Sequence, residues 1–150
     1  MSAAAVLCRV LHIAATCTSL GGLFYARAVL WPNLARLPEA ERGAFLPAMI
    51  RRFGYIKWAG IAVLAVTGVI QWRLVWPSLL DRRLYIGWFA LKMVAAAGLL
   101  TITSLLALPD SRLEGMRRSR AFWSGMNVAC GVLILIGAAL MRSVPRLAAR

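Results

Sequence analysis

The chain has 150 residues, 61% of which are hydrophobic, and its mean hydropathy is +0.74. A soluble domain of this size is usually about half apolar, so the composition indicates a membrane protein. Eighteen Lys and Arg oppose five Asp and Glu, which gives a net charge of +13. Because these basic residues lie between apolar stretches, we expect them to contact anionic lipid headgroups of a bilayer, and we exclude nucleic acid as the partner.

Four apolar stretches are long enough to be membrane spans, since a bilayer core of about 30 Å needs about 20 apolar residues in a helix. They cover about residues 8–31, 55–76, 84–108 and 121–141, and prolines fall between them. The predicted fold is all-α, a four-transmembrane-helix bundle forming one transmembrane domain over residues 1–150. The start MSAAAVLCRVLH has no basic region before its apolar run, so we interpret it as part of the first span and not as a cleaved signal.

The first connection is the long one, and its segment EAERGAFLPAMIRRF has an amphipathic pattern. Phe45, Met49 and Phe53 recur every four residues, and Arg51 and Arg52 supply basic heads. This pattern predicts a short helix lying in the membrane interface between the first and second spans. A polar loop is the alternative.

Basic residues also suggest an orientation in the membrane. An even number of spans puts both termini on one side, and the first and third connections hold more basic residues than the other side. The first set is Arg27, Arg36, Arg42, Arg51, Arg52, Lys57, Arg112, Arg117, Arg118 and Arg120, and the second is Arg9, Arg73, Arg82, Arg83, Arg142, Arg146 and Arg150. The positive-inside rule then predicts cytoplasmic first and third connections with both termini outside. We expect the membrane to be the bacterial inner (cytoplasmic) membrane.

Each span gathers its polar and small residues on one helical stripe, which we expect to face the interior of the bundle. The stripes are Cys8, His12, Thr16, Ser19 and Leu23; Gly60, Leu64, Thr67, Gly68 and Gln71; Tyr85, Trp88, Lys92, Ala96, Leu99 and Thr103; and Trp123, Asn127, Gly131, Ile134 and Ala138.

His12 is the only histidine, and it shares its stripe with Cys8 one turn earlier. Thiolate and imidazole both suit Cu(I), so Cys8 and His12 are candidate metal ligands, and His12 alone is a candidate haem ligand. Cys17 points about 140° away from His12 at about 100° per residue, and it does not join this site. A histidine that only forms a hydrogen bond across helices is the alternative. Three cysteines without a CxxC spacing exclude a full disulfide framework.

Lys92 is charged and lies within the third span, where no acidic residue is available to pair with it. Its candidate partners are backbone carbonyls, Gln71, Asn127, water, or an anionic group such as a haem propionate or a lipid phosphate. Snorkelling of its amine to the interface is the alternative.

Several motifs resemble a known group of membrane proteins. LHIAATCTSLGGLFYAR, RRFGYIKWAG, WFALKMVAAAGLL and MNVACGVLILIGAALM are similar to segments of copper resistance protein D (CopD)-like membrane domains and of the related HemJ-type protoporphyrinogen oxidases. The resemblance implies a role for His12, Gly21, Gly22, Lys92 and Asn127, with His12, Lys92 and Asn127 as cofactor-binding residues. It also implies copper or haem b as the cofactor.

Three functions remain open from the sequence. The first is a CopD-like, non-enzymatic protein that handles copper or supports a metal or redox membrane complex. The second is an accessory transmembrane subunit of a respiratory or photosynthetic complex, packed against other subunits or a second copy of itself. The third is a haem-binding oxidase of the HemJ type, although Thr101, Thr103 and Ser104 stand where those oxidases carry a histidine. Soluble catalysis is excluded because all five acidic residues lie in connections, away from His12.

Overall fold

A computed structural model describes residues 2–34, 36–107, 115 and 119–146. These residues form helices and no strand, and four of the helical stretches are long and apolar enough to cross a membrane. The four stretches are Ala3–Leu34, Glu39–Ser78, Arg82–Leu106 and Ala121–Ser143. The predicted all-α fold with four spans is therefore confirmed, and its helices are those of an integral membrane protein.

Large apolar side chains point outward along all four helices, as expected of helices that face lipid. Val66 is 61% exposed, Val94 is 71% exposed and Phe122 is 63% exposed. Lipid acyl chains are as apolar as these side chains, so the bilayer removes the cost that water would impose on them.

The chain divides into two compact units, residues 1–75 and 76–150. A single transmembrane domain over residues 1–150 stays a prediction.

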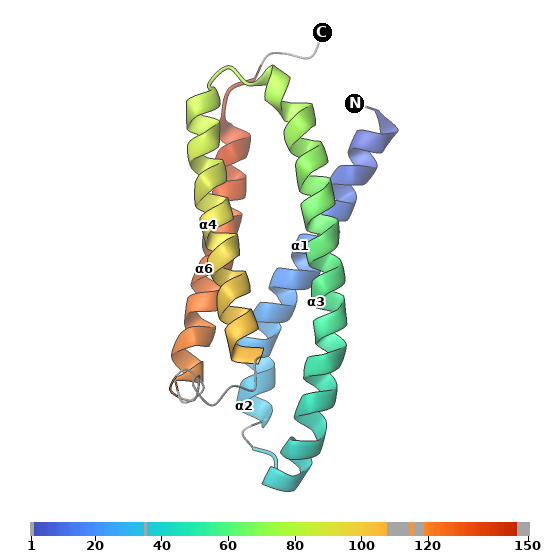
Figure 1. Ribbon diagram of the computed structural model, residues 1–150, viewed down its shortest axis with the longest axis vertical. Coiled ribbons are helices and arrows are strands. Elements are labelled where there is room, and N and C mark those ends of the chain that lie inside the picture. The colour runs from blue at the N-terminus through green and yellow to red at the C-terminus, as the bar shows by residue number, and fades with distance from the viewer. Residues whose placement is uncertain (1, 35, 108–114, 116–118, 147–150) are drawn as a thin grey trace. The chain divides into compact units, whose positions relative to one another are not determined.

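The first unit contains the helix α1 (Ala3–Tyr25), the π-helical segment η1 (Ala26–Leu30), the helix α2 (Trp31–Leu34) and the helix α3 (Glu39–Val75). In Figure 1, α1 in blue crosses α3 in green, and the two helices pack against each other. The Ser2 hydroxyl caps α1 by accepting a hydrogen bond from the Ala5 amide at 3.3 Å. The first span therefore begins earlier and ends later than the predicted range of 8–31.

The π-helical turn before Pro32 has a local cause. Proline has no amide hydrogen and its ring displaces the carbonyl four residues earlier, so a regular helix is disturbed there. The amide of Trp31 instead donates to the Ala26 carbonyl, five residues back. The Asn33 side chain donates to the Val29 carbonyl at 2.7 Å. These two bonds carry the helix past the proline.

The segment predicted to form a separate interfacial helix is helical, but it is the first part of α3. The helix runs without a break for 37 residues and contains Pro47. A single proline near the start removes one helical hydrogen bond, and no other strong helix breaker stands before Val75. At about 1.5 Å per residue α3 is about 56 Å long, so its first turns extend beyond a bilayer core of about 30 Å.

The second unit contains the short 3₁₀ segment η2 (Trp76–Ser78), the helix α4 (Arg82–Ala107) and the helix α6 (Arg120–Ser143). Figure 1 shows α4 and α6 side by side, and their contacts run in opposite directions along the two chains. Gly137 meets Lys92, Cys130 meets Gly98, and Asn127 meets Thr103. The helix α4 begins two residues before the predicted span 84–108, and α6 extends beyond the predicted span 121–141 at both ends. The predicted end at residue 108 and Arg112, Arg117 and Arg118 of the third connection lie outside the described residues.

The loop before α4 pairs with the segment that follows α6. Leu79 and Arg146 form an isolated antiparallel bridge, and the Leu80 amide donates to the Pro145 carbonyl at 3.2 Å. Leu79, Tyr85 and Val144 are each no more than 5% exposed and form a small apolar core at this end. This pairing fixes the ends of α4 and α6 to each other.

Candidate functional site

His12 of α1 contacts Thr67 of α3 by a hydrogen bond of 2.8 Å between Nδ1 and Oγ1. The Thr67 hydroxyl donates its one hydrogen to the Val63 carbonyl, as is common for threonine in a helix. It must therefore accept from His12, so Nδ1 carries the hydrogen of the neutral ring. The other ring nitrogen, Nε2, then holds the lone pair that can bind a metal.

Cys8 meets the same residue of α3 through a different atom. Its thiol donates to the Thr67 carbonyl at 3.6 Å, and the side chain is only 7% exposed. Thr16 adds a bond from its hydroxyl to the His12 carbonyl at 2.8 Å. Cys8 and His12 thus both face α3 at Thr67, as the common stripe predicted.

Small residues of α3 let α1 approach this closely. A Cβ atom added at Gly68 would lie 3.6 Å from His12 Cε1, which is ordinary contact. A Cβ atom at Gly60 would lie 2.9 Å from the Ser19 hydroxyl, which is too close. The helices therefore meet through glycine, a common device where membrane helices pack.

The glycine pair of the first span has two separate surroundings. A Cβ atom at Gly22 would lie 2.5 Å from ring atoms of Phe53, so the aromatic ring of α3 occupies the space that a side chain would take. Gly21 has nothing within 4 Å of such an atom. Gly22 is thus a packing residue between α1 and α3.

In the second unit, Asn127 and Lys92 lie at different levels of the α4–α6 pair. The Asn127 amide donates to the Thr103 hydroxyl at 3.0 Å, and the side chain is 4% exposed. Lys92 packs against Gly137, where an added Cβ atom would lie 3.2 Å from the Lys92 Cβ. Thr103 and Lys92 are eleven residues apart on α4, about 16 Å along the helix. The structure therefore does not bring Lys92 and Asn127 together.

Several other sulfur-bearing side chains of the described residues face outward or pack singly between helices. Cys17 is exposed, in agreement with its predicted position off the His12 stripe. In the second unit Met93 is 49% exposed and Met126 is 42% exposed, while Cys130 lies beside Gly98.

The donor set is small but chemically suited to one kind of metal. Among the described residues no group of three or more His, Cys, Asp or Glu side chains could hold a metal ion. Cys8 and His12 offer two donors at most, one sulfur and one nitrogen, which is the set that suits Cu(I). Cys8 must release its thiol hydrogen and its bond to Thr67 before it can bind a metal.

The contact of Thr67 with His12 was not predicted from the sequence. Thr67 was placed on the polar stripe of the second span with Gly60, Gly68 and Gln71, but nothing in the sequence paired it with His12. Its position one residue before a glycine on that stripe was the only signal.

No family model, curated protein sequence or solved structure matches the chain.

Proposed function

We propose that the chain is a non-enzymatic, CopD-like integral membrane protein that handles copper, with His12 as its principal ligand. The observation that supports this most directly is the bond from His12 Nδ1 to Thr67 Oγ1. The N–H group of the second ring nitrogen in a metal-binding histidine usually donates a hydrogen bond to a protein acceptor, which fixes the tautomer and the ring orientation. Thr67 supplies such an acceptor to His12.

Cys8 is the second donor in this proposal. It lies one helical turn before His12 and faces the same residue of α3. A buried thiol bonded to a carbonyl is a protonated, weak donor, and binding Cu(I) would displace its hydrogen. We therefore assign Cys8 a smaller share of the affinity than His12.

Haem b is the second candidate, and the same hydrogen bond favours it. The lone pair on His12 Nε2 is equally suited to the iron of haem. Lys92, on a different unit of the chain, stays a predicted partner of a propionate group. A subunit that only packs against larger membrane proteins is the third possibility, and it predicts no cofactor on this chain.

Metal analysis and an absorption spectrum of the detergent-purified protein, before and after loading with Cu(I) or haem, test the proposal. We expect about one copper per chain and a loss of at least tenfold in affinity in His12→Ala, because the ligand itself is removed. Cys8→Ser should weaken copper binding less. Thr18→Val is the matched control, since Thr18 is exposed and its hydroxyl only donates to Ala14 within α1.

Each outcome separates the candidates. A Soret band that is lost in His12→Ala would assign haem in place of copper. Copper binding that is equal in wild type and His12→Ala would refute the ligand role. If the wild-type protein binds neither copper nor haem after incubation with each, the subunit that only packs against larger membrane proteins becomes the favoured function.

A further inference from the structure

Four arginines gather at the end of the second unit where the loop before α4 pairs with the segment after α6. Arg82 and Arg83 begin α4, Arg142 lies in the last turn of α6, and Arg146 follows it. The bridge between Leu79 and Arg146 and the bond from Leu80 to Pro145 hold the two segments together. We call this region the arginine end.

The positive charge of the arginine end is largely uncompensated. Asp81 is the one acidic side chain of the second unit within the described part of the chain. Its Oδ1 atom accepts a hydrogen bond from the Leu84 amide at 2.9 Å, so it caps the start of α4. One carboxylate against four guanidinium groups leaves a region that attracts anions.

Two of the arginines are held in place by other groups. The Arg82 guanidinium lies 5.3 Å from the centre of the Trp76 ring, a cation–π contact that uses the face of the guanidinium and leaves its edge to donate. The Arg146 guanidinium donates through Nη2 to the Met141 carbonyl at 3.4 Å, while its Nε atom is buried without a hydrogen-bond acceptor. Arg146 thus has donor capacity that the described residues do not use.

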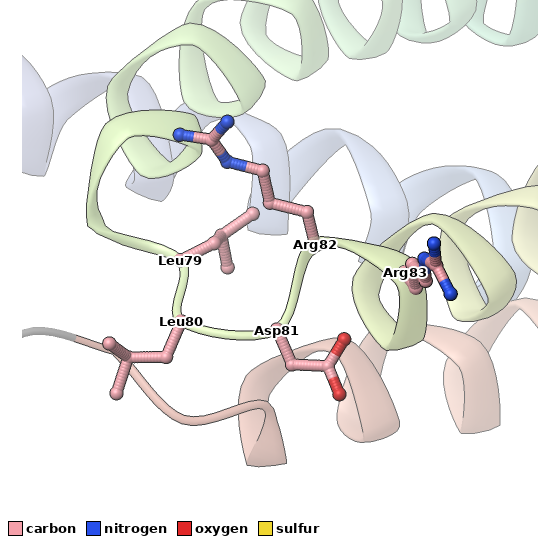
Figure 2. A pocket seen from close by; sticks show the side chains of 5 residues that line it. All are labelled: Leu79, Leu80, Asp81, Arg82 and Arg83. Atoms are coloured by element: carbon pink, nitrogen blue, oxygen red, sulfur yellow. The ribbon is translucent and has the colours of Figure 1, made fainter.

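A hollow at this end is lined by both apolar and charged groups. Leu79, Leu80, Asp81, Arg82 and Arg83 form its wall. Figure 2 shows Arg82 and Arg83 projecting to different sides of the loop, while Leu80 points away from both. Guanidinium groups therefore lie on different sides of the apolar leucine side chains, and they do not converge on one small ion.

The ends of the helices indicate where the hollow would lie in a bilayer. We expect it near the boundary between the hydrocarbon core and the headgroups, because α4 begins and α6 ends there. Tryptophan prefers this level, and Trp76 contacts Arg82 in the region. Lipid phosphates are then expected at the depth of the arginines.

We propose that the arginine end binds anionic phospholipid, with headgroup phosphates against Arg82 on one side of the loop and Arg83 on the other, and the acyl chains against the neighbouring apolar side chains. Arginine matches phosphate through several donors of a planar group, and each basic residue near an anionic membrane surface adds to the attraction. This inference is independent of the copper proposal, because the two involve different units of the chain.

The experiment compares two pairs of neighbouring arginines, one at the arginine end and one on α3. The full chain is purified in detergent, and retention of phosphatidylglycerol over phosphatidylcholine is measured by native mass spectrometry for wild type, R82Q/R83Q and R51Q/R52Q. Arg51 and Arg52 are exposed on α3, so the control removes the same charge elsewhere. We expect wild type and the control to prefer phosphatidylglycerol, and R82Q/R83Q to lose roughly tenfold or more of that preference.

Three results would overturn the proposal. The first is an equal loss of the preference for phosphatidylglycerol in R51Q/R52Q. The second is a wild-type protein without that preference, and the third is displacement of bound phosphatidylglycerol by millimolar inorganic phosphate. Circular dichroism and gel filtration of each variant verify folding. If R82Q/R83Q does not fold, Arg82→Gln alone and Arg83→Gln alone replace it in the same comparison.

Discussion

Thr67 decides how His12 is presented, because one hydroxyl both donates to α3 and accepts from α1. The Val63 carbonyl takes its hydrogen, and His12 Nδ1 donates to its oxygen. A valine at this position would keep the shape of the side chain and remove both bonds. Thr67 would then no longer determine the tautomer and the ring orientation of His12.

We therefore predict that Thr67→Val weakens copper binding about 10- to 100-fold, the usual effect of losing a group that orients a metal ligand. Isothermal titration with Cu(I) in detergent measures the affinity. Thr18→Val should bind like wild type, since the Thr18 hydroxyl bonds only within its own helix. Unchanged affinity in Thr67→Val would show that His12 is oriented by something else.

At the scale of helices, α4 and α6 approach each other closely at Gly137. An added Cβ atom at Gly137 would lie 3.2 Å from the Lys92 Cβ and 3.4 Å from the Trp88 carbonyl. Backbone atoms and a Cβ atom cannot move aside as the end of a flexible side chain can. A larger residue at this position must push the two helices apart.

We predict that Gly137→Val destabilises the protein by about 1–3 kcal/mol, the usual cost of adding atoms to a packed contact. The thermal unfolding midpoint in detergent should fall by several degrees. Gly125→Val is the control on the same helix, because a Cβ atom at Gly125 meets nothing within 4 Å. Equal midpoints for the two variants would contradict the role of Gly137.

At the scale of the whole molecule, an even number of spans predicts that both ends of the chain lie on one side of the membrane. The arginines of the first and third connections outnumber the basic residues of the other side in the sequence. The positive-inside rule concerns these loops and gives the direction of insertion. The orientation stays a prediction.

We expect alkaline phosphatase fused after Arg146 to be active, and the same enzyme fused after Pro38 to be inactive, because it folds only outside the cytoplasm. Colony activity of the two fusions in a bacterial host measures this, with immunoblots to verify equal expression. The opposite pattern would place both termini inside and reverse the predicted orientation.

The amino-acid pattern alone was enough to predict the helical spans and the face of each helix that packs against another helix. Hydrophobic length and the absence of charge decide which segments cross a bilayer, and helical spacing decides which residues share a side. These signals are local along the chain, so Cys8 and His12 were correctly placed on one face and Cys17 off it. The start of α3 was predicted as a separate helix, because its amphipathic pattern does not reveal that the helix continues into the next span.

Which helix faces contact each other, and in what register along the helix axes, became known only from the three-dimensional structure. Thr67 became the partner of His12, and Asn127 met Thr103 instead of Lys92, because the register between two helices depends on where small residues allow close approach. Phe53 fills the space over Gly22 for the same reason. Such contacts join residues 24 to 55 positions apart, and helical periodicity within one segment contains no information about them.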